Sequence, residues 1–183
     1  MFKGHPRGLY VLFFTEMAER FSFYSMLALF TLYMSAPESE GGLGWSRADA
    51  SMHYAWYLGF VYFSPFFGGI IADRLTGYRR AIMLGGVFFC AGHILLALPG
   101  MMAFYTALVC LVIGNGFFKP NISTMVGQLY PPDSPLRDSG FNIFYMGINI
   151  GALFSPFVAG TLAKYYGWHA GFGAAAVVMF LSL

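Results

Sequence analysis

The chain reads Glu16-Met-Ala-Glu19-Arg20-Phe-Ser-Phe-Tyr24 in the middle of an apolar run at residues 9–34. At 1.5 Å rise per residue this run is long enough to cross a bilayer, so its three charges would lie at membrane depth. Each charge would cost roughly 2.5 to 3.5 kcal/mol at the centre of an inserted helix, so three together indicate a use. The string predicts a membrane helix involved in transport or ion coupling.

The composition of the whole chain favours a membrane protein. Of its 183 residues, 58% are hydrophobic and only 10% are charged, whereas about a quarter of a soluble domain is charged. The net charge of +2 is small and dispersed, which argues against a nucleic-acid surface. Six segments have about the 20 residues needed to cross the membrane: 9–34, 51–72, 81–98, 102–127, 140–163 and 169 onward.

These segments predict an all-α integral membrane protein in which residues 1–183 form one transmembrane bundle. The last helix is expected to be truncated, as part of a longer polypeptide, because the chain ends in an apolar run at Leu183. Basic residues divide six to two between the ends of the bundle, with Arg47 and Lys164 on the poorer side. The six on the richer side are Lys3, Arg7, Arg74, Arg79, Arg80 and Arg137, so we expect a cytoplasmic N-terminus.

An internal repeat relates the second and fifth spans. Residues 63–73 read FSPFFGGIIAD and residues 154–164 read FSPFVAGTLAK, with six identities in eleven positions. The segments are three spans apart and therefore cross in opposite directions, as an inverted repeat of three plus three helices requires. A chance match between apolar segments rich in Pro and Gly is the alternative.

The charged string of the first span is the first candidate site. Helical spacing places Glu16, Glu19, Arg20 and Tyr24 on one face. Burial disfavours a charged carboxylate while a nearby guanidinium favours it, so a glutamate exposed to both influences can bind and release a proton. The alternative is a static ion pair that holds helices together.

Further polar groups occur in three other spans. Lys119, in the string GNGFFKPN at residues 114–121, can bind an anionic group, pair with a glutamate of the first span, or extend to the membrane interface. Asn149, between two glycines, can bind a ligand or a neighbouring helix. Tyr62, deeper in its span than its aromatic neighbours, is the better pocket candidate of that group.

The string GIIADRLTGYRR at residues 69–80 follows the second span. Its glycines, Gly69 and Gly77, permit a tight turn, and Asp73 can cap a helix or pair with an arginine. Arg74 and the later arginines can equally belong to an ordinary positive-inside loop.

These four motifs together resemble the proton-dependent oligopeptide transporters, a branch of the major facilitator superfamily. The strings HPRG at residues 5–8 and GWH at residues 167–169 extend the resemblance over the full chain. It implies the N-terminal six-helix bundle of a major facilitator fold, with a C-terminal six-helix bundle missing from this sequence. Members import di- and tripeptides across the cell membrane by alternating access, coupled to inward proton movement.

The resemblance also implies roles for individual residues. Proton coupling would involve Glu16, Glu19, Arg20 and Lys119, and the peptide pocket would be lined by Arg20, Tyr24, Tyr62, Lys119 and Asn149. Gly69, Asp73, Arg74 and Gly77 would form a cytoplasmic loop that stabilises one conformation. The chain departs from many relatives at Leu27, where they carry an arginine, and at Phe23, where a tyrosine is common. His53 does not align with the histidine of animal members.

Other classes of function have weaker support. An intramembrane enzyme would need a nucleophile or a metal set, but the four histidines show no ligand spacing. We therefore expect no enzyme activity, no metal and no cofactor, with peptides, protons and membrane lipids as partners. A transporter of another small solute and a non-transporting membrane fragment or scaffold are the alternatives.

Overall fold

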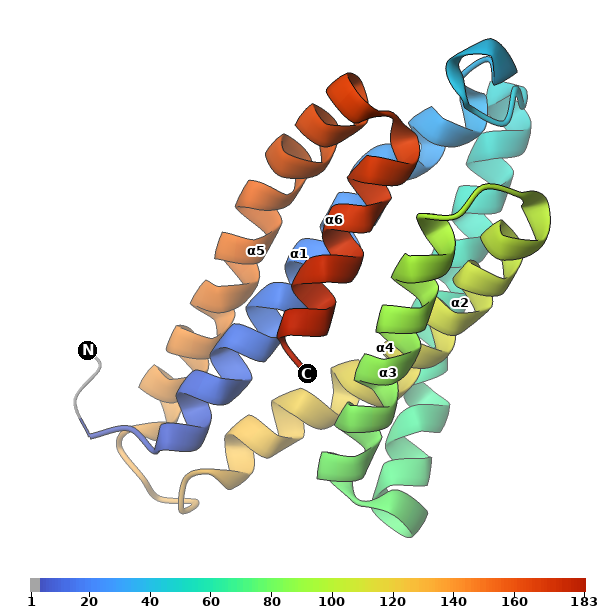
Figure 1. The fold of residues 1–183 in the computed structure, drawn as a ribbon. Coiled ribbons are helices and arrows are strands. Elements are labelled where there is room, and N and C mark those ends of the chain that lie inside the picture. The colour runs from blue at the N-terminus through green and yellow to red at the C-terminus, as the bar shows by residue number, and fades with distance from the viewer. Residues whose placement is uncertain (1–3) are drawn as a thin grey trace.

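Six long helices form the chain in the computed structural model, which describes residues 4–183 (Figure 1). They are α1 (Arg7–Ser35), α2 (Arg47–Ile71), α3 (Tyr78–Leu96), α4 (Met101–Gln128), α5 (Arg137–Tyr166) and α6 (Trp168–Leu181). A short 3-10 helix, η1 (Glu38–Glu40), follows α1, and a π-helical turn, η2 (Ala72–Thr76), follows α2. The described residues contain no strand, and each long helix corresponds to one predicted span.

Four of these segments are long and apolar enough to cross a membrane: α2 together with η2, α3, α4 and α5. The sequence predicted six spans, but α1 and α6 are not among the helices that qualify as membrane-crossing by length and apolar composition. The 29 residues of α1 suffice in length, but its charged and small polar residues lower its hydropathy. The 14 residues of α6 are fewer than the about 20 that a crossing needs.

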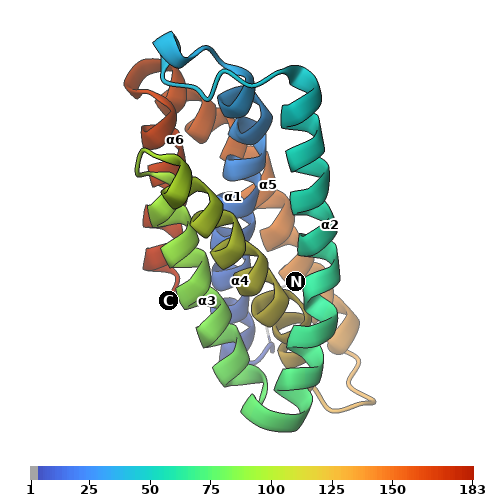
Figure 2. The ribbon, with the colours of Figure 1, turned by 90° about the vertical axis from the view of Figure 1, so that its right-hand side faces the viewer.

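The helices are arranged in two groups of three (Figure 1, Figure 2). One group contains α1, α5 and α6, and the other contains α2, α3 and α4; α3 also packs on α6 and so joins the groups. In Figure 1, α2 descends while α5 ascends. The opposite directions of these two helices agree with the inverted repeat predicted from their matching sequences.

Glycines allow several helix pairs to approach closely. A Cβ atom at Gly68 on α2 would overlap the carbonyl oxygen of Gly116 on α4. Pro120 lacks the N–H that would normally bond this carbonyl four residues earlier, so the oxygen is free to face α2. On the other side of α4, a Cβ at Gly85 of α3 would lie 2.8 Å from the carbonyl oxygen of Gly114. These contacts hold α4 between α2 and α3.

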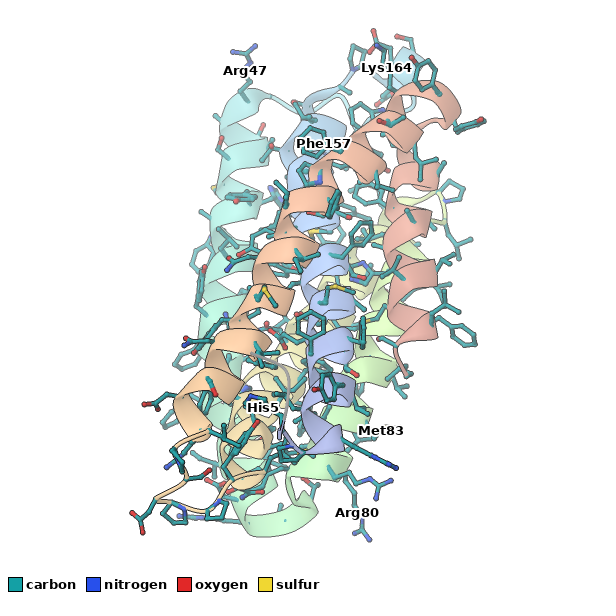
Figure 3. All side chains as sticks on the ribbon, turned by 90° about the vertical axis from the view of Figure 1, so that its left-hand side faces the viewer. His5, Arg47, Arg80, Met83, Phe157 and Lys164 are labelled. Atoms are coloured by element: carbon teal, nitrogen blue, oxygen red, sulfur yellow. The ribbon has the colours of Figure 1, made fainter. Side chains whose placement is uncertain are left out.

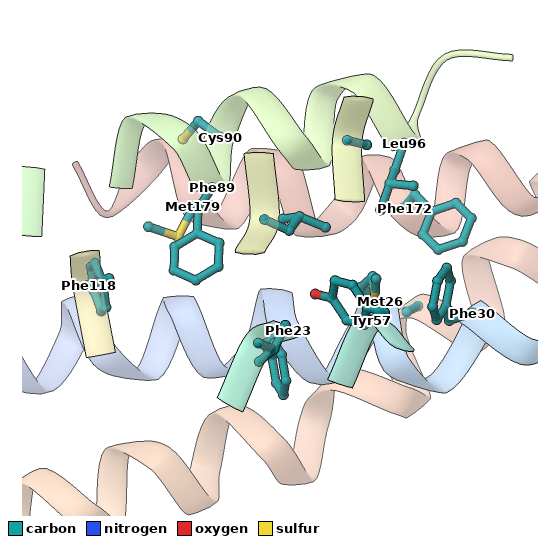
Figure 4. Close-up of a cluster of buried hydrophobic side chains, with 14 of the residues drawn as sticks. Phe23, Met26, Phe30, Tyr57, Phe89, Cys90, Leu96, Phe118, Phe172 and Met179 are labelled. Carbon is teal, nitrogen blue, oxygen red and sulfur yellow. The ribbon is translucent and has the colours of Figure 1, made fainter. Parts of the chain in front are cut away.

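Large apolar side chains fill the space between the helices. Figure 4 shows part of this core, with Phe30 of α1, Phe89 of α3, Phe118 of α4 and Phe172 of α6 all buried. The Phe89 and Phe118 rings meet edge to face, with centroids 5.8 Å apart. The interior therefore excludes water around the middle of α1, where the charged string lies.

Apart from Arg20 of α1 and Lys119 of α4, the described basic side chains lie at the two ends of the bundle, as predicted. Figure 3 shows Arg47 and Lys164 at one end, and Arg80 with His5 at the other. The turn η2 and the segment between α4 and α5 also lie at the second end (Figure 1). Lys3, which the sequence also assigned there, lies outside the described residues.

Candidate functional site

Arg20 is the centre of a buried ion cluster on α1. Its guanidinium donates from Nε and Nη2 to the two carboxylate oxygens of Glu19. The Nε atom also lies 3.5 Å from Oε1 of Glu16, one helical turn earlier. All three residues are at most 4% exposed. The helical spacing of the string thus places two acids and one base in a single dry cluster.

Glu16 is the less satisfied of the two acids. Its Oε2 atom is buried and has no hydrogen-bond partner among the described residues. Burying a carboxylate oxygen without a donor is costly, whereas a protonated carboxyl group tolerates the same surroundings better. Glu19, by contrast, has both oxygens bonded to Arg20. The geometry therefore leaves one oxygen of Glu16 without a partner and makes Glu19 the doubly bonded partner of Arg20.

Close packing of α1 against its neighbours keeps this cluster dry. A Cβ at Gly151 of α5 would overlap the carbonyl oxygen of Met17 and lie 3.3 Å from the Cβ of Arg20. On another side of α1, the Ser22 hydroxyl donates to the carbonyl oxygen of Ala175 on α6, at 2.8 Å. The small residues of the sequence thus position the charged face of α1.

Lys119 brings a second cation to the site from α4. It interacts electrostatically with Glu16, Glu19 and Arg20, although the direct ion pairs in residues 4–183 are those of Arg20. The Lys119 ammonium lies 5.4 Å from the centroid of the Tyr62 ring on α2, within the range of a cation–π contact. Tyr62 is 69% exposed. One cation is therefore enclosed by carboxylates while the other is held by an exposed aromatic ring.

Two aromatic residues that the sequence did not mark as site residues interact with the cluster. The Arg20 guanidinium carbon lies 4.7 Å from the centroid of the Phe23 ring, and Tyr57 of α2 is buried and interacts electrostatically with Glu19 and Arg20. The sequence singled out Phe23 only for its missing hydroxyl, and Tyr57 is one of the aromatic neighbours of Tyr62 in the second span. Only their positions in the sequence could have indicated this. Phe23 follows Arg20 by three residues on α1, and Tyr57 lies one turn before Val61, so Tyr57 and Val61 both occupy the buried side of α2.

Tyr24 and Asn149 are not members of the ion cluster, although Tyr24 interacts electrostatically with Arg20, one helical turn earlier. Tyr24 is partly exposed and its ring meets that of Phe23 edge to face, at 5.4 Å. Asn149 is exposed on α5, and no hydrogen bond joins it to another helix in residues 4–183. At 100° per residue it faces away from the glycines that pack against α1. The structure therefore does not bring Asn149 into contact with the other predicted site residues.

The loop motif lies at the arginine-rich end, away from the cluster. Asp73 and Arg74 are exposed in η2. Gly77 ends this turn with φ of 73° and donates its N–H to the carbonyl oxygen of Ala72, at 2.9 Å. A left-handed φ favours glycine, which explains the residue type at this tight turn. Asp73 interacts with the hydroxyl of Tyr78, the first residue of α3.

Comparison with known proteins decides the family. A family model described as the POT family matches residues 79–183, more than half of the chain. The chain belongs to the POT family. A Bacillus subtilis relative, the uncharacterized transporter YclF, is 49% identical over all 183 residues. A di-/tripeptide transporter of Lactococcus lactis is 45% identical over the full chain.

Solved structures of POT family members have the same fold. A crystal structure of the peptide transporter POT in complex with sulfate matches the whole chain with a TM-score of 0.96 and 48% identity. A POT family transporter in complex with 5-aminolevulinic acid matches with a TM-score of 0.96 and 43% identity. The chain spans 37% of the length of YclF and 38% of the latter structure. These POT relatives are transporters and not enzymes, and the chain corresponds to their N-terminal half.

Proposed function

We propose that this chain forms the N-terminal bundle of a proton-coupled symporter that imports di- and tripeptides across the cell membrane by alternating access. The N-terminus would be cytoplasmic, on the side that carries the excess of arginine. A C-terminal six-helix bundle would supply the facing wall of the peptide pocket. Transport would be carried out by the full-length POT protein, with both bundles present.

The unpartnered Oε2 of Glu16 carries the proposal. A buried carboxylate is stabilised by the positive charge of a nearby guanidinium. When the carboxylate is protonated it becomes neutral and no longer needs that guanidinium. Protonation of Glu16 would therefore loosen the attraction of the cluster for Arg20 and Lys119. A cation released in this way can bind the carboxylate of a peptide.

Linkage makes the coupling reciprocal. If proton binding makes a cation available to the peptide, peptide binding in turn favours the protonated form of the glutamate. One proton that enters down about 100 mV contributes roughly 2.3 kcal/mol, enough for an accumulation of about fiftyfold. Arg20 and Lys119 would hold the peptide carboxylate, with Tyr24, Tyr62 and Asn149 along the pocket. Gly69, Asp73, Arg74 and Gly77 would form the loop that stabilises one conformation.

A second candidate substrate is a small amino-carboxylic acid other than a peptide. The observation that favours it is the related POT structure in complex with 5-aminolevulinic acid. Such a molecule carries a carboxylate that the same two cations could bind. Competition between this compound and a dipeptide would indicate that both use one pocket.

Uptake into proteoliposomes tests the proposal. Full-length protein, with its C-terminal bundle, is reconstituted and given an acidic exterior with labelled dipeptide. We expect concentrative uptake that collapses when a protonophore removes the proton gradient. Uptake of equal size without any gradient would contradict proton coupling, and uptake of 5-aminolevulinic acid without dipeptide uptake would contradict the proposed substrate.

A further inference from the structure

Asn115 of α4 is a buried polar residue to which the proposed peptide site gives no role. The residue is 1% exposed. Its Nδ2 atom donates to the carbonyl oxygen of Val61 on α2, at 2.6 Å, where α2 and α4 pack side by side (Figure 2). The opposite orientation of the amide would bring two oxygens together, so this bond fixes which way the amide faces. A side chain of α4 is thus bonded to the backbone of α2.

The carbonyl oxygen of Val61 needs a side-chain donor because of Pro65. In a regular helix this oxygen would accept from the N–H four residues later, and proline at that position has no N–H. The Ser64 hydroxyl also donates to the oxygen, at 3.3 Å, so Asn115 makes the shorter of the two side-chain hydrogen bonds. A buried carbonyl oxygen without a donor is costly, and Asn115 removes that cost from another helix.

Both ends of this hydrogen bond lie next to the cation–π pair of Lys119 and Tyr62. The bonded carbonyl belongs to the peptide group that joins Val61 to Tyr62. On α4, Lys119 follows Asn115 by one helical turn and on the same side of the helix. The bond therefore fixes the position of the Tyr62 backbone relative to the turn of α4 that carries Lys119.

The Lys119 ammonium has two competing sets of partners. One is the exposed ring of Tyr62, whose centroid lies 5.4 Å away. The other is the pair of buried carboxylates, Glu16 and Glu19, with which Lys119 interacts electrostatically. A lysine side chain is long and flexible enough to shift between such partners. A ring that is held in place keeps the ammonium away from the acids.

We propose that Asn115 is a positioning residue for Lys119. It holds the backbone of Tyr62 so that the ring keeps the ammonium on the exposed side of the site, where a peptide carboxylate can reach it. The inference deepens the proposed function and rests on it, because that function makes Lys119 a ligand of the peptide. The competing explanation is that Asn115 serves only to satisfy the carbonyl oxygen of Val61.

Chemical labelling tests the positioning without transport. Full-length protein in detergent is treated with an amine-reactive reagent, and mass spectrometry gives the labelling rate of Lys119 relative to that of Lys164, an exposed lysine on α5. Asn115→Leu should lower this ratio about threefold, because the ammonium moves toward the buried acids when the ring no longer retains it. Tyr62→Leu, a change at an exposed position, should lower it similarly. An unchanged or higher ratio in either variant would overturn the proposal.

Replacing Pro65 separates positioning from satisfaction of the carbonyl. Pro65→Ala restores the N–H that Val61 lacks, so the double variant Pro65→Ala, Asn115→Leu keeps this carbonyl bonded and replaces Asn115→Leu if the single variant does not fold. Pro65→Ala alone is the control and should label as the native protein does, because the bond from Asn115 remains. The double variant should label as slowly as Asn115→Leu. A native ratio in the double variant would mean that Asn115 only satisfies the carbonyl, and would overturn the proposal.

Uptake kinetics connect the positioning to the peptide. In proteoliposomes, Asn115→Leu should raise KM about fivefold for dipeptides with a free carboxylate, with little change in kcat or in KM for peptides blocked as amides. Equal increases for both kinds of peptide would indicate general damage to the pocket and contradict the proposal. Slower labelling of Lys119 with an unchanged KM would support the positioning and contradict instead the peptide-binding role of Lys119 in the proposed function.

Discussion

At the scale of single residues, the two cations of the site differ in their surroundings. Arg20 is enclosed by Glu16 and Glu19, while Lys119 lies against the exposed ring of Tyr62. Lys119 is therefore the more accessible partner for a substrate carboxylate, and Arg20 is the more tightly coupled to the acids.

Replacing Lys119 tests this division. Lys119→Ala should raise KM for peptides with a free carboxylate about tenfold or more, because a charge-assisted contact is lost. The KM for peptides whose carboxylate is blocked as an amide should change much less. Uptake kinetics of both substrates provide the measurement, with Lys119→Arg as the charge-preserving control. Equal increases for both substrates would argue against carboxylate binding by Lys119.

His93 gives a second prediction at this scale. The side chain is 1% exposed, and neither ring nitrogen has a hydrogen-bond partner in the described chain. Removing an unsatisfied buried donor should gain about 1 kcal/mol, so His93→Leu should raise Tm in detergent. His169→Leu is the matched control and should lower Tm, because His169 Nδ1 is hydrogen-bonded to the carbonyl oxygen of Leu96, at 3.1 Å. A lower Tm for His93→Leu would reveal a stabilising role for the imidazole.

The sequence predicted the members of the ion cluster but not their pairing. Helical spacing was enough to group Glu16, Glu19 and Arg20, because it depends only on the geometry of one helix. Glu19, rather than Glu16, accepts hydrogen bonds from both Nε and Nη2 of Arg20. This depends on side-chain rotamers, which cannot be predicted from the spacing of residues along a helix. The contact between Lys119 and Tyr62 depends on how two helices pack, and so required the structure.

At the scale of elements, the helices are positioned by close contacts between their backbones, which glycines permit. Gly68 of α2 faces the carbonyl oxygen of Gly116, which Pro120 leaves without its helical donor. The motifs at residues 63–73 and 114–121 contain these residues, but only the packing of α2 against α4 shows which glycines meet. The sequence predicted the bounds of the helices to within a few residues, because apolar length marks most of them, whereas the choice of packing partner depends on complementary surfaces.

Adding a methyl group to α2 tests the close approach. Gly68→Ala should destabilise the bundle by about 3 kcal/mol, because the new Cβ would overlap backbone atoms that cannot move aside. Gly59→Ala, on the same helix, is the matched control, since no atom lies within 4 Å of its added Cβ. The control should be neutral or gain up to about 1 kcal/mol from better helix propensity. Equal thermal stability of the two variants would contradict the packing described.

At the scale of the whole molecule, the charged cluster lies where the two groups of helices meet. Glu16, Glu19 and Arg20 come from the group of α1, α5 and α6, while Lys119, Tyr57 and Tyr62 come from the group of α2, α3 and α4. A change of charge at Glu16 therefore acts across the boundary between the groups. Proton binding at this place can influence both groups at once, which suits a device that couples an ion to a conformational change.

Proton-driven uptake by Glu16→Gln is the most direct test of the central claim. The variant should lose accumulation driven by an acidic exterior and retain counterflow exchange of labelled peptide, because glutamine mimics the protonated side chain. Native protein should accumulate more peptide as the external pH falls, and Glu38→Gln, an exposed residue in η1, should behave as native. Driven accumulation by Glu16→Gln equal to that of native protein at every external pH would contradict the assignment of Glu16 as the proton acceptor.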